Sequence, residues 1–319
     1  MPGEILGLHH VTAMAGDPQA NLDFYVGVLG QRLVKRTVNQ DDPGTYHLYY
    51  GVDVGTPGSL MTFFPWPGAQ RGRRGTGLVT SSSYSILPSS VGYWTERLKR
   101  LGIGFDSPIT RRGETILAFA DPDDLRLELV ASPAGDPRPG FAWGDVPAEH
   151  AIRGFHSVAM SVGGYERTAK LLAEHMGFRP LWDEAERFRY AIGSGGPGAL
   201  VDVRCQPDAP RGQVSVGQVH HVAWRVADDA AHAAWHEKLV GLGYDITPVV
   251  ERFYFKSVYF REPGGVLFEI ATDPPGMTVD ERADALGEKL VLPPWLESMR
   301  PRIERVLPPL GPADHARLA

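Results

Sequence analysis

The sequence has little of what several large classes of protein require. It contains one cysteine, Cys205, in 319 residues, so no intramolecular disulfide can form, and a single thiol is typical of a reducing compartment. No apolar run approaches the ~18 residues of a membrane span, and the N-terminus lacks the basic and apolar regions of a signal peptide. Basic residues are not in excess, because 32 Lys and Arg stand against 38 Asp and Glu. We therefore expect a cytoplasmic protein that binds neither nucleic acid nor membranes.

Glycine and proline, in contrast, are abundant at 37 and 27 residues, which favours many short elements joined by turns. One short motif recurs along the chain: LHHVTAMA at 8–15, FHSVAMSV at 155–162, VHHVAWRV at 219–226 and, more weakly, SYSILPSS at 83–90. Each copy is typical of a strand, and a helix ending near glycine and two or three β-type runs follow it. The repeat predicts an α+β fold of four βαβββ modules, near 5–66, 80–132, 152–206 and 217–273.

A single module has a four-stranded sheet with a helix on one face, so its other face must be covered. We expect the modules to pair into two cupped, barrel-like sheets with the helices outside and side chains converging in the hollow. Residues 1–132 form the N-terminal half and 152–273 the C-terminal half, joined by a Pro-rich linker at 133–151. The tail at 274–319 is predicted to contain a helix at about 279–290 and to pack on the body. Exposed module edges favour a homo-oligomer.

Two His-His pairs, His9-His10 and His220-His221, begin equivalent strands. Adjacent strand residues face opposite sides, so one histidine of each pair faces the hollow, either His10 with His221 or His9 with His220. Glu269 lies within the apolar run VLFEIAT, where an unpaired carboxylate is costly to bury. A metal ion would compensate its charge. Two histidines and one carboxylate are the ligand set of the facial-triad non-haem Fe(II) site.

The other modules offer a weaker version of the same pattern. Glu128 occupies the matching place in module two, but the repeat places Ser85 and Ser157 where modules two and three would need a histidine. We interpret Glu128 as a hydrogen-bonded or solvated strand residue. A lone strand histidine is ordinarily a core or surface residue, and the matching repeat positions are what favour a site in modules one and four.

At these residues the chain resembles the vicinal oxygen chelate (glyoxalase/bleomycin resistance) superfamily, and most closely its hydroquinone-type ring-cleaving dioxygenases. The resemblance extends over nearly the whole chain and is carried by the stretches at 8–51, 57–67, 219–226, 252–269 and 292–297. It implies an enzyme that opens an aromatic diol with O2 at Fe(II), with the metal held by His10, His221 and Glu269.

The resemblance also places five further residues around the substrate: His9, Thr12, His220, Arg252 and Tyr259. Of these, Arg252 and Tyr259 are expected to hydrogen-bond the reacting oxygens. His9 or His220 is expected to move a proton, since histidine titrates near neutral pH.

The resemblance further predicts which modules pair. Family members that cleave catechols take both histidines from the second half of the chain. Here Ser157 fills the module-three position, so His10 must serve instead. Modules one and four must then pair, and modules two and three must form the other cup.

Two other functions remain open from the sequence. A glyoxalase-like isomerase or lyase with Zn(II) or Ni(II) would need a second glutamate, but MTFF stands at the matching place in module one. A non-enzymatic protein that binds small aromatic molecules is the third hypothesis. The sequence also leaves open whether the diol is hydroquinone, a substituted hydroquinone or catechol.

Overall fold

Sixteen strands form two curled sheets in the computed structural model, which describes residues 3–318. The first sheet has the order β14-β15-β16-β13-β1-β4-β3-β2 and the second has β10-β11-β12-β9-β5-β8-β7-β6. The strands of the first sheet are β1 (Leu8–Ala15), β2 (Arg32–Val38), β3 (Tyr46–Gly51), β4 (Leu60–Pro65), β13 (Val219–Val226), β14 (Val250–Glu251), β15 (Lys256–Arg261) and β16 (Leu267–Thr272). Those of the second are β5 (Leu78–Ile86), β6 (Ile109–Arg111), β7 (Glu114–Ala120), β8 (Arg126–Ala131), β9 (Phe155–Val162), β10 (Arg179–Glu184), β11 (Arg187–Ala191) and β12 (Leu200–Cys205).

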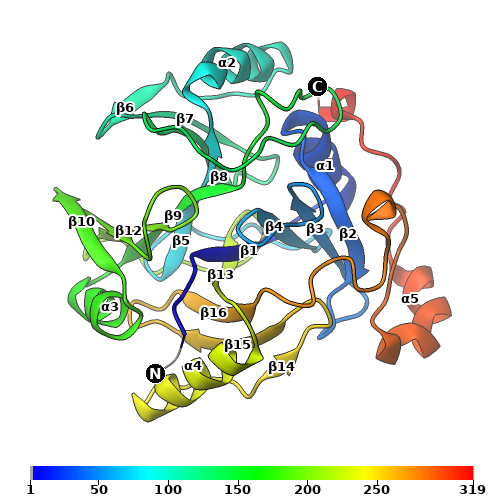
Figure 1. The fold of residues 1–319 in the computed structure, drawn as a ribbon. Coiled ribbons are helices and arrows are strands. Elements are labelled where there is room, and N and C mark those ends of the chain that lie inside the picture. The colour runs from blue at the N-terminus through cyan, green and yellow to red at the C-terminus, as the bar shows by residue number, and fades with distance from the viewer. Residues whose placement is uncertain (1–2, 319) are drawn as a thin grey trace.

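These strand orders confirm the predicted fold of paired βαβββ modules. The first sheet combines strands from the two ends of the chain, modules one and four, and the second combines modules two and three. Figure 1 shows the two sheets with the module helices on their outer sides. The chain termini therefore contribute neighbouring strands, which brings residues more than 200 positions apart into one hollow.

The helices of modules one and four begin at capping aspartates. Asp17 accepts hydrogen bonds from the backbone N–H groups of Gln19 and Ala20, and Asp228 accepts one from Ala231. Modules one and three have short helices, α1 (Pro18–Leu22) and α3 (Glu166–Lys170), each continued by a π-helical turn. Modules two and four have regular helices, α2 (Val91–Arg100) and α4 (Asp229–Gly241). Within residues 3–318, no helix is both long enough and apolar enough to span a membrane.

Antiparallel pairing of β1 with β13 joins the two ends of the chain. Thr12 lies opposite His221 and His10 opposite Ala223, and the register shifts at His9 and again at His220. Each of these residues is the extra residue of a β-bulge. Bulges commonly re-aim side chains next to functional sites. The strict alternation that the sequence predicts for the His-His pairs is therefore interrupted at both pairs.

Strands β5 and β9 of the second sheet repeat this arrangement. Their register shifts at Thr80 and at His156, the counterparts of His9 and His220. Ser83 lies opposite Ser157 as Thr12 lies opposite His221, so the counterpart of His10 in module two is Ser81. The sequence alignment that placed Ser85 there was wrong, because β5 begins at Leu78 and is longer than the repeat indicates.

The apolar core lies between the sheets and their helices. Helix α2 buries Trp94 and Leu98, and α4 buries Trp235 and Leu239. Burying a side chain of this kind contributes roughly 1.5–3 kcal/mol relative to leaving it exposed. These contacts hold each helix against the outer face of its sheet and leave the inner faces for polar residues.

The helix predicted at about 279–290 is wrong. That segment contains only a 3-10 turn, Ala283–Ala285. Asp280 and Glu281 turn inward to ion pairs with buried Lys35, and Gly287 adopts φ 79° with the Leu33 carbonyl where a Cβ would lie. A regular helix would direct these groups elsewhere.

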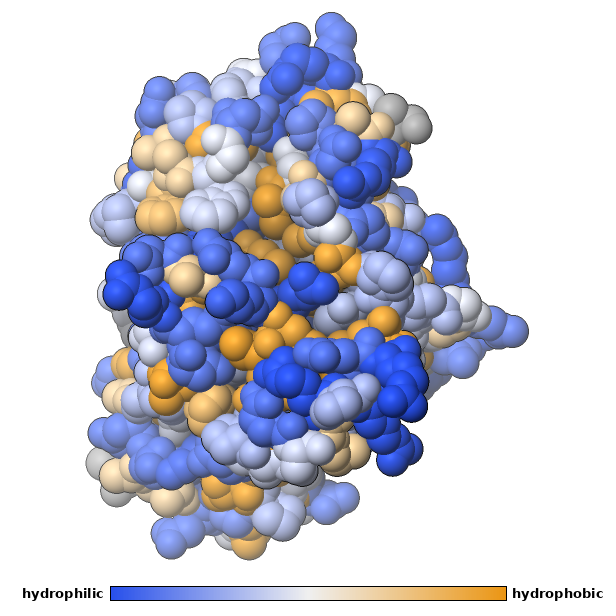
Figure 2. All heavy atoms as spheres, turned by 90° about the vertical axis from the view of Figure 1, so that its right-hand side faces the viewer, coloured by the Kyte–Doolittle hydropathy of each residue, from blue (hydrophilic) through white to orange (hydrophobic). Residues whose placement is uncertain are grey.

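The remainder of the tail packs on the body, as the sequence predicts. It forms a 3-10 turn (Pro294–Met299), α5 (Arg300–Val306) and a last 3-10 turn (His315–Leu318). The buried tail residues that join the core are Leu292, Leu296, Ile303 and Leu307. On the face of the molecule in Figure 2, apolar side chains are visible mainly in hollows between hydrophilic ones.

The Lys35 ion pairs lead to a stability prediction. Lys35 Nζ lies 2.7 Å from Asp280 Oδ1 and 2.5 Å from Glu281 Oε2. Lys35→Met leaves two largely buried carboxylates without their cation, which should lower the free energy of unfolding by about 3 kcal/mol. Urea denaturation measures this change, with the exposed Lys289→Met as the matched control. Equal midpoints for the two variants would contradict the structural role of Lys35.

Candidate metal and active site

Two neighbouring rows of residues cross the inner face of the first sheet. The strand registers align the first row as Tyr259, Glu269, Ala223 and His10. They align the second row as His221, Thr12, Thr62 and Tyr49. His10 and Thr12 are two positions apart on one strand, so the two rows share a face. Pairing therefore collects polar residues from six strands at one place in the hollow.

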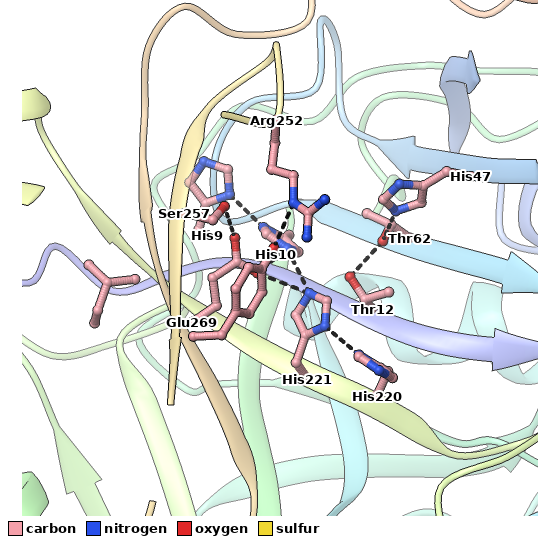
Figure 3. A network of polar contacts seen from close by, with 12 residues as sticks. His9, His10, Thr12, His47, Thr62, His220, His221, Arg252, Ser257 and Glu269 are labelled. Atoms are coloured by element: carbon pink, nitrogen blue, oxygen red, sulfur yellow. Dashed lines mark hydrogen bonds and ion pairs between the residues drawn. The ribbon is translucent and has the colours of Figure 1, made fainter. Parts of the chain in front are cut away.

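His10, His221 and Glu269 are brought together at the meeting point of β1, β13 and β16 (Figure 3). Glu269 Oε2 lies 3.1 Å from His10 Nε2 and 3.0 Å from His221 Nε2. The two Nε2 atoms are 3.2 Å apart. All three side chains are buried. Of the two histidine pairings that the strand pattern leaves open, the structure joins His10 with His221.

The Glu269 carboxylate is held from one side only. Ser257 donates a hydrogen bond to Oε1, and Oε2 is buried without a hydrogen-bond partner among the described residues. Burial alone would raise the pKa of Glu269, but His10 and His221 hold it well below its ordinary value. The carboxyl is therefore a carboxylate whose free oxygen faces the two histidines.

The first histidine of each pair, His9 or His220, holds the ring of the second. His9 Nδ1 lies 2.8 Å from His10 Nδ1, and His220 Nδ1 lies 2.8 Å from His221 Nδ1. Burial lowers the pKa of His9 well below its usual value and that of His220 to about 3. Neutral His9 and His220 can each accept a hydrogen bond through Nδ1 from the Nδ1–H of the neighbouring ring. This arrangement fixes the tautomer, as partners of metal-ligating histidines do.

This tautomer tests whether the residues fit a metal. When His10 and His221 donate through Nδ1, their Nε2 lone pairs and Glu269 Oε2 all point at one another. Three acceptor atoms at 3.0–3.2 Å repel unless a cation lies between them. The donor set and its spacing therefore fit a divalent metal ion bound on one face.

Arg252 and Tyr259 lie beside the triad. Arg252 donates from Nε to the Tyr259 hydroxyl at 3.3 Å, and its two Nη atoms bind the Asp41 carboxylate at 3.1 and 2.9 Å. The Tyr259 ring packs edge-on against His221, with ring centroids 5.6 Å apart. Burial raises the pKa of the Tyr259 phenol, so the hydroxyl keeps its proton. Because Arg252 occupies the phenolic oxygen, that proton can be donated elsewhere.

Thr12 leads to two residues that the sequence reasoning missed. Its hydroxyl lies 2.7 Å from that of Thr62, which lies 2.9 Å from His47 Nε2, and His47 Nδ1 lies 2.9 Å from the Tyr49 hydroxyl. His47 and Tyr49 are two positions apart on β3 and face the hollow. The sequence does alternate polar and apolar residues there, in YHLYYG, but gives no partner for either residue. Ser257 was missed for the same reason.

A cavity of about 610 Å³ opens over these residues. His10, His221, Arg252 and Tyr259 line it, with His47 and Tyr49 among the other polar residues. His220 also lines it, whereas His9 does not. Apolar side chains form much of the remaining wall: Met14, Phe64, Trp66, Phe255 and Leu267. The size and the mixture of apolar walls with a few polar groups suit a small aromatic molecule.

The second sheet has no equivalent of this centre. Ser81 and Ser157 replace the histidines, and Glu128 accepts a hydrogen bond from Ser83 at 2.6 Å, in agreement with the predicted hydrogen-bonded role. Asp202, the counterpart of Glu269 in module three, binds the Arg189 guanidinium at 2.6 and 2.9 Å. Within residues 3–318, His10, His221 and Glu269 are the single group of three or more such side chains that could hold a metal.

Comparison with known proteins gives a consistent family. Residues 7–129 and 154–270 match the profile of the glyoxalase/bleomycin resistance protein/dioxygenase superfamily. MhqO of Bacillus subtilis, which is named as a ring-cleaving dioxygenase, is 43% identical over 97% of this chain and 98% of its own. The chlorohydroquinone/hydroquinone 1,2-dioxygenase of Sphingobium indicum is 35% identical over 96% and 97%. A crystal structure of a B. subtilis protein named as a dioxygenase superimposes with a TM-score of 0.92 at 42% identity, covering 98% of this chain and 99% of that one.

The triad geometry predicts metal content directly. Glu269→Ala removes the carboxylate ligand, whereas Glu128→Ala removes its counterpart in the second sheet. Mutating a residue that hydrogen-bonds a metal ligand typically lowers metal affinity by about 10–100-fold. Removing a ligand itself should therefore lower the affinity by at least about 10-fold. After anaerobic loading with Fe(II) and desalting, metal analysis should find iron in the Glu128→Ala protein and little in Glu269→Ala. Equal iron in both would exclude Glu269 as a ligand.

Proposed function

The chain belongs to the glyoxalase/bleomycin resistance protein/dioxygenase superfamily, and on this basis we propose that it is an Fe(II)-dependent ring-cleaving dioxygenase. Its substrate is hydroquinone or a related aromatic diol, opened with O2. The observation that carries the proposal is the convergence of His10 Nε2, His221 Nε2 and Glu269 Oε2 at the floor of a cavity with largely apolar walls. The relatives named as ring-cleaving dioxygenases support the reaction class.

The ligand set favours Fe(II) over a structural metal. Two histidines and a carboxylate occupy one face of an octahedral ion and leave the other positions for substrate and O2. A structural zinc site is usually closed by four ligands, often cysteines. The one cysteine, Cys205, lies on β12 in the other sheet.

The same geometry argues against a glyoxalase-like isomerase. In module one, the residue aligned with Glu269 is Thr62, which pairs with Thr12 as Glu269 pairs with Ala223. Thr62 is hydrogen-bonded within the wall and supplies no fourth carboxylate. A non-enzymatic binding protein would have no need for three acceptor atoms that face one another.

Iron bound here would provide open positions for a substrate oxygen and for O2 and would lower the pKa of the bound hydroxyl. The cavity walls hold the ring in place, which converts the encounter into a reaction between positioned groups. His220 also lines the cavity, where its Nδ1 accepts a hydrogen bond from His221 and its Nε2–H can donate one to a substrate oxygen. Its low pKa of about 3 makes it a poor proton acceptor, so the proton-moving role expected from the sequence is not assigned to it. His9 lies outside the cavity and acts as a positioning residue for His10.

Arg252 and Tyr259 act on the oxygens of the substrate. Asp41 holds the guanidinium, and Arg252 in turn occupies the Tyr259 oxygen, so the phenol O–H points to the reacting oxygen. Donors fixed in this way stabilise the negative charge that develops there without having to reorient. Thr12 does not line the cavity and lies behind it, where its hydroxyl bonds Thr62, the partner of His47.

The reaction class is tested by oxygen consumption. We expect the chain, reconstituted anaerobically with Fe(II), to consume one O2 per molecule of hydroquinone, because a dioxygenase inserts both oxygen atoms. An oxygen electrode and the absorbance of the semialdehyde product follow the two sides of the reaction. If the protein binds iron but takes up no oxygen with hydroquinone or catechol, the proposed metal site stands and the proposed dioxygenase activity is wrong.

Tyr259→Phe tests the donor role. The change removes one hydroxyl and should lower kcat by roughly 10²-fold, the usual effect of losing one donor to a developing oxyanion. Tyr244→Phe, a half-buried tyrosine packed against Phe260, is the matched control and should keep the wild-type kcat. Both proteins should retain their iron. An unchanged kcat in Tyr259→Phe would show that its hydroxyl takes no part in the reaction.

A further inference from the structure

The second row of polar residues leads away from the metal centre across the sheet. From His221 on β13 it passes through Thr12 on β1 and Thr62 on β4 to Tyr49 on β3. Strands are about 4.8 Å apart, so Tyr49 is attached about 14 Å from His221 along the sheet. Both side chains nevertheless line the same cavity, because the sheet curls. Tyr49 and its neighbour His47 therefore stand on the wall across the cavity from His221 and Glu269.

The Tyr49 hydroxyl on this wall can make one further hydrogen bond. His47 uses Nε2 towards Thr62 and Nδ1 towards the Tyr49 hydroxyl, at 2.9 Å each. If the phenol donates to Nδ1, its oxygen can still accept a hydrogen bond. If Nδ1–H donates to the phenol, the O–H can still donate one. A hydroxyl group is both donor and acceptor, so it complements Tyr49 in either case.

Neighbouring polar groups on the cavity wall are already engaged. Asp41 binds the Arg252 guanidinium, and Gln40 donates to the Arg252 carbonyl at 2.9 Å. Phe64, next to His47 with ring centroids 4.3 Å apart, presents only an apolar surface. The Tyr49 hydroxyl, oriented by His47, is therefore the group of this wall that remains to recognise an oxygen of the substrate.

We propose that His47 and Tyr49 form a subsite for the second hydroxyl of the substrate and thereby select para-diols over ortho-diols. This inference rests on the proposed function, in which the first hydroxyl lies at the metal. A para-diol carries its oxygens at opposite ends of the ring and reaches both walls. An ortho-diol carries both oxygens at one end, and its far edge places C–H groups against Tyr49. Tyr49 binds the hydroxyl, and His47 is the positioning residue that orients Tyr49.

The experiment compares Tyr49→Phe with Tyr50→Phe. Tyr50 is the next residue on β3, faces the other side of the sheet and donates to Asn21, so it is a matched control for loss of one buried hydroxyl. Anaerobic calorimetry of the metal-loaded proteins measures the affinity for hydroquinone and for catechol. Oxygen uptake measures kcat/KM for the same two diols.

We expect Tyr49→Phe to lose roughly 10–100-fold in affinity and kcat/KM for hydroquinone, with those for catechol nearly unchanged. Tyr50→Phe should keep the wild-type preference between the two diols. His47→Gln should shift that preference in the same direction as Tyr49→Phe, and it replaces Tyr49→Phe as the test if that protein does not fold.

Two results would overturn the subsite. One is an equal loss for hydroquinone and catechol in Tyr49→Phe. The other is a hydroquinone affinity that neither Tyr49→Phe nor His47→Gln changes. If the wild-type chain consumes no O2 with either diol, the proposed function falls, while calorimetry still decides whether Tyr49 binds the second hydroxyl.

Discussion

Antiparallel pairing of β1 with β13 is the constraint on which the rest of the site depends. It sets His10 and His221 side by side although 210 residues separate them in the chain. The bulges at His9 and His220 belong to the same pairing, and they place these two rings against the rings of His10 and His221. A slip of one residue in this register would send every inward side chain of β1 to the opposite face. The candidate metal-binding triad, its hydrogen-bonded supports and the cavity above it are consequences of one strand pairing.

The two sheets show how one scaffold can bury carboxylates in different ways. In the second sheet Asp202 is neutralised by Arg189, and half-buried Glu128 accepts a hydrogen bond from a serine hydroxyl. In the first sheet Glu269 has only Ser257 on one oxygen, and the other oxygen faces two imidazoles. A buried charge normally requires a partner. The second sheet satisfies its acids with protein groups, while the first leaves one oxygen for a cation, and this difference marks the functional hollow.

Much of this could be predicted from the sequence, for a physical reason. The repeated strand motif with its His-His pairs indicates the symmetry of the fold, and Glu269 within an apolar run indicates a buried acid. Both are patterns of neighbouring residues, so the sequence alone shows them. The bulges could not be predicted, because they depend on the partner strand, and so Ser85 was placed where Ser81 stands. His47, Tyr49 and Ser257 were missed because their partners come from other strands. The helix predicted at 279–290 does not form, because the ion pairs of this segment with Lys35 outweigh its local helix propensity.

The distribution of the ligands along the chain has a consequence for how the protein is made. His10 leaves the ribosome well before His221 and Glu269, which both lie more than 200 residues further along the chain. Strand β1 cannot pair with β13 until β13 has been synthesised. Strands β5 and β9 of the second sheet are closer together in the chain and can pair earlier. The middle of the chain can therefore form the second sheet before the first sheet is complete. The three side chains of the candidate metal site can come together only after Glu269 has been synthesised, so a product truncated before Glu269 cannot form this centre.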